Sequence, residues 1–459
     1  MNMEFRPIPG SQEVEVHVVF RMARINETSS DDSTCVNMLQ AEEMLAQRLN
    51  EIGARATHKL LEQCDTAGEP LSAEGRKWTS KGRAPRMVET PHGTVRVLCH
   101  VYQTSAGGVT RVPLEERARL AGSATPRMAR MIASKLAQMN CGGVARDMRE
   151  NHLRSLSKSF AQDLGCVVAA LATVRADFGE WQPLSEPKEV ATVAIGVDGA
   201  HLNTREDGWR QSMAGTLALY DKKGDRLETL YAGGGPGETP AEGKVAFFTR
   251  MDELLERVCA RYPKARVVGL SDGAGDLQAY LAQRCDEHLL DFHHAAEYLS
   301  KAAAAFAPDQ RAESAEARDW AAKQRLVLRD ESLGARKILA HMRRRLKAAE
   351  GTVQTQRGAQ AKEPVKLTAS AREGLQSAVT YFDNHLETMD YAGWSQRQLP
   401  IGSGVTEAAC KTLIKQRLCQ SGMRWTVPAA DALISLRALY LTPSRWDHFW
   451  TQYLQTPAI

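Results

Sequence analysis

Two similar apolar stretches of the chain each end at an aspartate. They read Val193-Ala194-Ile195-Gly196-Val197-Asp198-Gly199 and Val267-Val268-Gly269-Leu270-Ser271-Asp272-Gly273, with the aspartates 74 residues apart. Short apolar runs rich in β-branched residues are typical of buried strands. Carboxylate oxygens are ligands that hard cations such as Mg²⁺ prefer. The two stretches therefore predict two central strands that bring a pair of acidic residues to one edge of a sheet.

Further elements can be placed around these two stretches. After a strand over 191–198, the pattern predicts strands over 209–220 and 226–231, a helix over 241–262, a strand over 266–271, a helix over 277–284 and a strand over 288–292. This order is expected of an RNase H-like α/β fold with a mixed five-stranded sheet. In that topology the first and fourth strands are neighbours. Asp198 and Asp272 would then meet, and a divalent cation would remove their repulsion.

A third acidic residue follows the glycine-rich stretch Gly402-Ser403-Gly404, where a helix is predicted to begin. This residue is Glu407, and Lys411 and Lys415 follow at four-residue steps on the same helix face. Such a face suits a metal ion and a phosphate backbone. Two metal ions about 4 Å apart would clamp the attacking and leaving oxygens of a phosphodiester. Glu297, close to the fifth strand, is the alternative third ligand.

The first 180 residues are expected to be mainly helical. The pattern predicts a long helix over 38–61, a loop over 64–85, a hairpin over 88–102 and a helical block from Ser123 onward. The block resembles a helix-turn-helix, with a plain helical bundle as the alternative. The basic residues around its turns, which we expect to bind DNA, are Arg146, Arg149, Arg154 and Lys158. Beyond the predicted Glu407 helix, Arg417, Arg424 and Trp425 are further candidate DNA contacts, with burial of Trp425 as the alternative.

Composition narrows the class of protein. The chain has 459 residues, of which 43% are hydrophobic and 25% charged, as in ordinary globular proteins. No apolar run reaches the roughly 18 residues of a membrane span, and no secretory signal is expected. The nine cysteines include no C-x-x-C pair, which argues against a zinc finger and fits a reducing cytosol. We therefore expect a cytoplasmic bacterial protein that joins the nucleoid when bound to DNA.

The charge of the chain is unevenly distributed. The net charge is +4, but residues 301–459 carry 23 basic against 15 acidic residues, and residues 81–160 carry 14 against 5. Two basic regions in a nearly neutral chain indicate two surfaces that face a polyanion. A solvated protein surface is the alternative.

Asp291-Phe292-His293-His294 ends the predicted fifth strand. A zinc site is not expected there, because no second pair of ligands lies at a suitable spacing. A histidine satisfied within the protein core is the alternative reading of this stretch.

With these stretches the chain resembles insertion-sequence transposases of the Asp-Asp-Glu class, of the ISKra-four type. The resemblance runs from about Glu89 to Trp450, and its most specific part is 399–411, Leu-Pro-Ile-Gly-Ser-Gly-Val-Thr-Glu-Ala-Ala-Cys-Lys. It implies a large all-α insertion before the Glu helix, as in the hAT and Mutator-like relatives. It also implies that Mg²⁺, with Mn²⁺ able to substitute, is bound by the catalytic residues Asp198, Asp272 and Glu407. Asp291 and His294 match a supporting motif of these relatives and are expected to buttress the site without binding the metal.

The expected organisation has five segments. They are an N-terminal helix and hairpin region (1–120), a helix-turn-helix-like DNA-binding region (121–180), the first part of the RNase H-like core (189–300), the helical insertion (301–396) and the Glu helix with C-terminal helices (397–459). The expected function is metal-dependent cleavage and transfer of double-stranded DNA at terminal inverted repeats, by a homodimer or higher oligomer. A resolvase or repair nuclease that cleaves without joining, and a domesticated DNA-binding regulator, are the alternatives.

Overall fold

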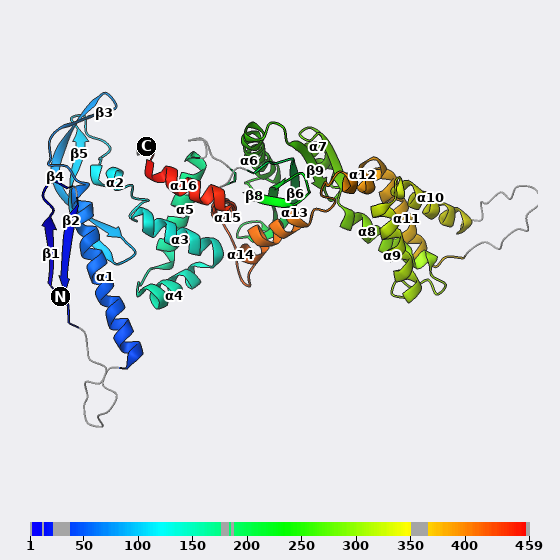
Figure 1. Ribbon diagram of the computed structural model, residues 1–459, viewed down its shortest axis with the longest axis horizontal. Coiled ribbons are helices and arrows are strands. Elements are labelled where there is room, and N and C mark those ends of the chain that lie inside the picture. Colours follow the sequence, from blue (N-terminus) through cyan, green and yellow to red (C-terminus); the bar gives the residue numbers. More distant parts are fainter. Residues whose placement is uncertain are drawn as a thin grey trace, which may run out of the picture. The chain divides into compact units, whose positions relative to one another are not determined.

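A computed structural model describes residues 2–11, 13–21, 37–175, 183–184, 188–349 and 366–455. The chain divides into two compact units (Figure 1). Unit 1 comprises Met1–Glu180 and Trp446–Ile459, and unit 2 comprises Trp181–Arg445. A division near residue 180 was predicted, whereas the predicted borders at 120, 300 and 396 do not separate compact units. The last predicted segment is itself divided, because its final residues belong to unit 1.

Unit 1 begins with more strand than the sequence pattern predicts. Its elements are β1 (Asn2–Pro7), β2 (Val14–Val19), α1 (Met38–Gln63), β3 (Leu71–Ala73), β4 (Arg76–Glu89) and β5 (Thr94–Thr104). The strands form an antiparallel pair β1-β2 and a sheet of order β3-β4-β5. The expected loop over 64–85 and the mainly helical character of the region are therefore wrong. The first half of β4 is largely exposed and rich in basic residues, so it lacks the apolar alternation that marks a strand.

The predicted helical block is present in unit 1. It consists of α2 (Pro113–Arg117), α3 (Pro126–Gln138), α4 (Cys141–His152) and α5 (Lys158–Arg175), and most of α16 (Pro443–Gln455) belongs to the same unit. Helix α3 starts with Pro126 in its first turn and buries Met128 and Ile132 completely. Only Met139 and Asn140 separate α3 from α4, and the Asn140 side chain caps α4.

Unit 2 contains the mixed five-stranded sheet. Its elements are β6 (Thr192–Thr204), β7 (Gly208–Tyr220), β8 (Arg226–Gly234), α6 (Pro240–Arg261), β9 (Arg266–Ser271), α7 (Gly275–Ala282) and β10 (Glu287–Leu290). The strand order is β10-β9-β6-β7-β8, with β6, β9 and β10 parallel and β7 antiparallel to both of its neighbours. The predicted adjacency of the first and fourth strands, β6 and β9, is confirmed. However, β6 does not end at Asp198, because its pairing with β7 continues to Thr204.

Each face of this sheet is covered by different helices. Ile195 and Val197 of β6 pack in one cluster with side chains of α6 and α7. Ala194 of β6 and Leu270 of β9 point to the other face, where they share a cluster with helices of residues 292–396. Those helices are α8 (Phe292–Ala302), η1 (Ala303–Phe306), α9 (Ala315–Asp330), α10 (Gly334–Ala349), α11 (Ala369–His385), η2 (Leu386–Thr388) and α12 (Tyr391–Gln396). The predicted helical block is thus not a separate domain, because its core is continuous with the sheet.

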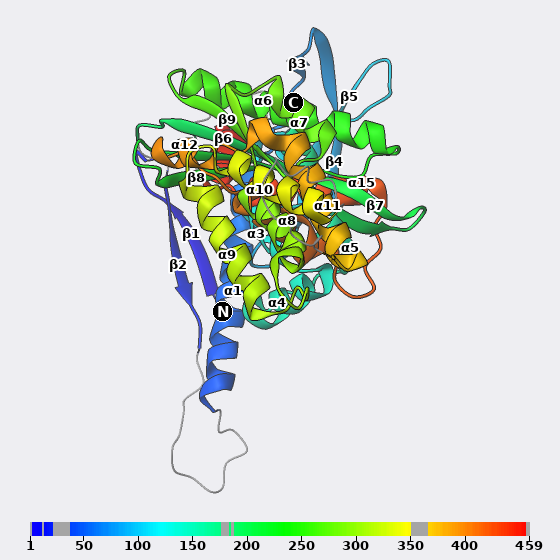
Figure 2. The ribbon, with the colours of Figure 1, turned by 90° about the vertical axis from the view of Figure 1, so that its right-hand side faces the viewer.

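Helices α9, α10 and α11 lie side by side in both views of the ribbon (Figures 1 and 2). After α12 the chain returns to the sheet as one nearly continuous helix, made of α13 (Gly404–Ala409), the π-helical η3 (Cys410–Lys415) and α14 (Gln416–Leu418). Helix α15 (Val427–Tyr440) follows and packs on β8. Within the described residues, no helix combines the length and the hydropathy needed to cross a membrane.

Candidate active site

The strand register places Asp198 and Asp272 at equivalent positions on neighbouring strands. Gly196 of β6 is paired with Leu270 of β9, and the two aspartates follow two residues later on each chain segment. Side chains two residues apart on a strand share a face, and neighbouring strands lie about 4.8 Å apart. Gly196 and Leu270 belong to the sheet face that the helices of residues 292–396 cover. Both aspartates, each half-buried, are therefore expected on that face at the same end of the strands.

Local hydrogen bonds hold both aspartates. The Gly199 N–H donates to Asp198 Oδ1 at 2.6 Å, and the Ala274 N–H donates to Asp272 Oδ1 at 3.0 Å. The Tyr381 hydroxyl of α11 donates to the backbone oxygen of Asp272 at 3.2 Å. The turn after Asp272 therefore depends on contacts from a helix more than a hundred residues further along the chain, and the sequence pattern did not reveal Tyr381.

Helix α13 reaches the sheet through a glycine. A side-chain Cβ on Gly196 would lie 1.8 Å from Thr406 Oγ1, so Thr406 occupies the space that the missing side chain leaves. The two buried hydroxyls of Thr406 and Thr216 are 2.9 Å apart and hydrogen-bonded. This contact seats the first turn of α13 on β6 and β7, two residues before Asp198. Glu407, the next residue, is half exposed at the same place.

Asp291 fastens the start of α13 to the start of α8. Its side chain is fully buried; Oδ1 accepts the His294 N–H at 2.8 Å as the cap of α8, and Oδ2 accepts the Ser403 N–H. The Phe292 N–H also donates to the Ile401 carbonyl at 3.1 Å. Burial raises the pKa of Asp291, but the hydrogen bonds from Ser403 and His294 outweigh it, so the pKa lies below its ordinary value.

His294 lies between Asp291 and Glu407. Its Nδ1 is 3.1 Å from Asp291 Oδ1 and 3.9 Å from Glu407 Oε1. Burial lowers the pKa of His294, but the hydrogen bond and the charge of Asp291 raise it more, so the pKa lies above its ordinary value. A carboxylate whose two oxygens already accept N–H groups and a histidine that favours its protonated form suit a supporting role better than metal ligation.

The three carboxylates proposed as metal ligands are not gathered into one tight group in this structure. Among the described residues, the group of possible ligands with all atoms within 4.8 Å of one another is Asp291, His294 and Glu407. Glu407 is half exposed, so its side chain has the rotamer freedom to turn toward the sheet. Its rival Glu297 is exposed on α8 and acts on His294 through its charge, but it is not a member of this group.

Cys410 connects the Glu407 helix to both aspartates. Its buried thiol, one turn after Thr406, donates to the Asp198 carboxylate. Burial, followed by the charge of Asp198, raises the pKa of this thiol, and the charge of Asp272 acts in the same direction. Both aspartates are therefore close enough to one buried atom of the Glu407 helix to affect its ionisation. Cys410 was not among the predicted site residues.

The π-helical segment begins at Cys410. A π-turn adds one residue to a helical turn and is common at functional sites. The simple four-residue spacing that predicted a common face for Glu407, Lys411 and Lys415 does not hold through it, although all three side chains are exposed. A basic, exposed edge thus follows Glu407.

Some predicted DNA contacts are not on the surface. Arg154 is 8% exposed and forms an ion pair with Glu89, so its assignment as a DNA contact is wrong. Arg417 is 1% exposed with its guanidinium over the Trp425 ring, and that assignment is wrong for the same reason. Trp425 donates its indole N–H to the Leu418 carbonyl at 2.8 Å and pairs with Thr204 through the backbone, which indicates a structural role. The remaining candidates in these regions are exposed, namely Arg146, Arg149, Lys158 and Arg424.

An exposed tryptophan lies where Trp425 was expected to act. Trp209, at the start of β7, is 64% exposed. Together with Asn203, Arg424 and the turn over 419–423, it lines a cavity of about 300 Å³. Its position beside Asp207-Gly208 in a hairpin turn, where a buried tryptophan is not expected, is the signal that could have identified it.

The Asp291 fastening leads to a first prediction. Asp291→Asn should reduce the free energy of unfolding by about 1–3 kcal/mol, because one N–H acceptor would become an NH₂ donor facing a backbone N–H. Urea unfolding of the two proteins measures this difference. Asp390→Asn is the matched control, since exposed Asp390 caps α12 and Asn caps helices equally well. Equal losses in both variants would contradict a special role for Asp291.

Comparisons with known proteins provide no relative. No family model matches this chain, and a search of curated proteins finds no similar sequence. Functional conclusions therefore rest on the residues described above.

Proposed function

We propose that this chain is a DNA transposase of the Asp-Asp-Glu class, which cleaves and joins DNA strands at the ends of an insertion sequence. The observation that supports this most strongly is the register of β6 and β9 together with the seating of Thr406 on Gly196. These two features bring Asp198, Asp272 and the Glu407 helix to one face and one end of a mixed sheet. The strand order is the one expected of an RNase H-like core.

The donor chemistry of the site fits a hard cation. Asp198, Asp272 and Glu407 would hold Mg²⁺, with Mn²⁺ as a substitute, because all three offer carboxylate oxygens that solvent reaches at least in part. When bound, the metal would supply charge neutralisation at the phosphodiester and activation of the attacking oxygen. Asp291 and His294 would keep the Glu407 helix in place, and no protein nucleophile is required.

Basic and aromatic side chains around this face would bind the DNA. Lys411 and Lys415 would neutralise backbone phosphates next to the reacting one. Trp209 and Arg424 would hold an unpaired base near the cleaved end, since base stacking on aromatic and guanidinium groups is independent of sequence. In unit 1, Arg146, Arg149 and Lys158 would contact the double-stranded terminal repeats, and a homodimer or higher oligomer would join two ends.

The proposal is tested with purified protein and DNA from the flanks of its reading frame. A labelled duplex carrying the terminal repeats, a target plasmid and Mg²⁺ should give a cleaved end and then a product in which its 3′ end is joined to the target. A duplex of the same composition in shuffled order is the control. Cleavage without any joined product would favour a resolvase or repair nuclease, and binding without cleavage would favour a regulator.

A further inference from the structure

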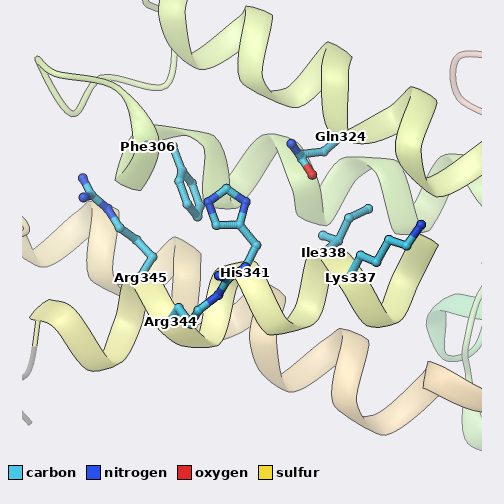
Figure 3. Close-up of a pocket in the computed structure, with 7 residues that line it drawn as sticks. All are labelled: Phe306, Gln324, Lys337, Ile338, His341, Arg344 and Arg345. Carbon is cyan, nitrogen blue, oxygen red and sulfur yellow. The ribbon is translucent and has the colours of Figure 1, made fainter. Parts of the chain in front are cut away.

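A cationic cavity lies on the helical block of unit 2, away from the acidic residues of the candidate active site. It has a volume of about 500 Å³ and lies between η1, α9 and α10. The residues that line it are Phe306, Gln324, Lys337, Ile338, His341, Arg344 and Arg345. Figure 3 shows His341 next to the Phe306 ring, with the basic side chains distributed along α10. None of the seven lining side chains is acidic.

The basic residues of α10 differ in whether an acidic group neutralises them. Arg336 pairs with Glu387 and Arg343 pairs with Asp383 on another side of the helix, and Lys337 at the rim pairs with Glu331. Exposed Arg344 instead donates to the Ala340 carbonyl of its own helix.

Arg345 donates to the Ala305 carbonyl and lies over the Phe306 ring. The hydrogen bonds of the two arginines that line the cavity therefore go to uncharged backbone oxygens, and their charges stay available to an anion.

The floor of the cavity is rigid and aromatic. The rings of Phe306 and Trp320 are stacked with centroids 4.1 Å apart, and His341 meets the Phe306 ring edge-on at 4.8 Å. Burial lowers the pKa of His341, and the charges of Arg344 and Arg345 lower it further. The positive charge of the cavity therefore comes from its arginines and lysine, held on a firm base.

We propose that this cavity binds the phosphate backbone of double-stranded DNA, as a second contact remote from the site of cleavage. The inference rests on the proposed function in that it takes DNA as the polyanion. Lys337 and Arg344 are seven residues apart, about 10 Å along a helix axis. Phosphates of one strand follow at about 3.4 Å along the duplex axis, so this distance spans roughly three of them. A single inorganic phosphate or the phosphate group of a free nucleotide is too short to reach both ends.

The test compares two neighbouring arginines of α10. Arg344→Ala and the matched control Arg343→Ala are titrated with a 30-base-pair duplex of arbitrary sequence, without Mg²⁺, over a range of salt concentrations. Loss of one phosphate contact should reduce the slope of log affinity against log salt by about 0.9, and should weaken binding roughly eightfold at 0.1 M salt. We expect this for Arg344→Ala and not for Arg343→Ala, with Arg344→Lys restoring most of the loss.

A second measurement distinguishes the sources of phosphate. Arginine modification of the intact protein by phenylglyoxal, read by mass spectrometry, should be blocked at Arg344 by the duplex and not by the same phosphate concentration supplied as ATP or inorganic phosphate. Equal slopes for the two alanine variants, or protection by ATP alone, would overturn the proposal. Neither readout needs cleavage, so a failed joining assay and a failed cavity are separate results.

Discussion

Glu407→Gln is expected to abolish DNA cleavage while the protein still folds and binds DNA. The substitution keeps the size of the side chain but removes the charge that would hold a divalent ion beside Asp198 and Asp272. A metal ion acting as a Lewis acid contributes several kcal/mol to the transition state, and each 1.4 kcal/mol is a factor of ten. The cleavage rate should therefore fall by about 1,000-fold or more. Because Glu407 is half exposed and Thr406 makes the docking contact, the unfolding free energy should change little.

Glu297→Gln is the matched control for this experiment. Glu297 is also an exposed glutamate near His294, but it lies on α8 and outside the group formed by Asp291, His294 and Glu407. Its variant should keep cleavage within a few-fold of the parent protein. Cleavage retained in Glu407→Gln and lost in Glu297→Gln would show that the third ligand had been assigned to the wrong helix.

The sheet could be predicted from the sequence because its strands carry strong local patterns. The apolar runs ending at Asp198 and Asp272 were sufficient to place two adjacent parallel strands, and their register places both aspartates at one edge. The exposed strand β4 escaped prediction, since its first half is polar and carries no alternation. The continuation of β6 to Thr204 depends on pairing with β7, which a single segment does not reveal.

The surroundings of the candidate site were less predictable because they depend on contacts between distant segments. Residue type alone made Arg154 and Arg417 look like DNA contacts, whereas Glu89 and the Trp425 ring hold them inside the protein. Likewise, Asp291 carried a histidine-spacing signal, but its hydrogen bond to Ser403 links positions more than a hundred residues apart. The π-turn at Cys410 has no sequence signature that propensity rules capture.

Gly196→Ala should both destabilise unit 2 and reduce cleavage, because a Cβ at this position would lie 1.8 Å from Thr406 Oγ1. Overpacking of this kind typically costs about 1–3 kcal/mol, and it would push the Glu407 helix away from Asp198. Gly404→Ala on the same helix is the control, since nothing lies within 4 Å of the added carbon there.

The double variant Gly196→Ala with Thr406→Ala distinguishes a steric clash from a general loss of stability. Thr406→Ala alone should also destabilise, because it leaves the buried Thr216 hydroxyl without its 2.9 Å partner. In the double variant the clashing oxygen is gone, so urea unfolding should give a loss smaller than the sum of the single losses by about 0.5–3 kcal/mol. Cleavage should recover in parallel. Strictly additive losses, with cleavage no better than in Gly196→Ala alone, would mean that the contact between Gly196 and Thr406 does not position Glu407.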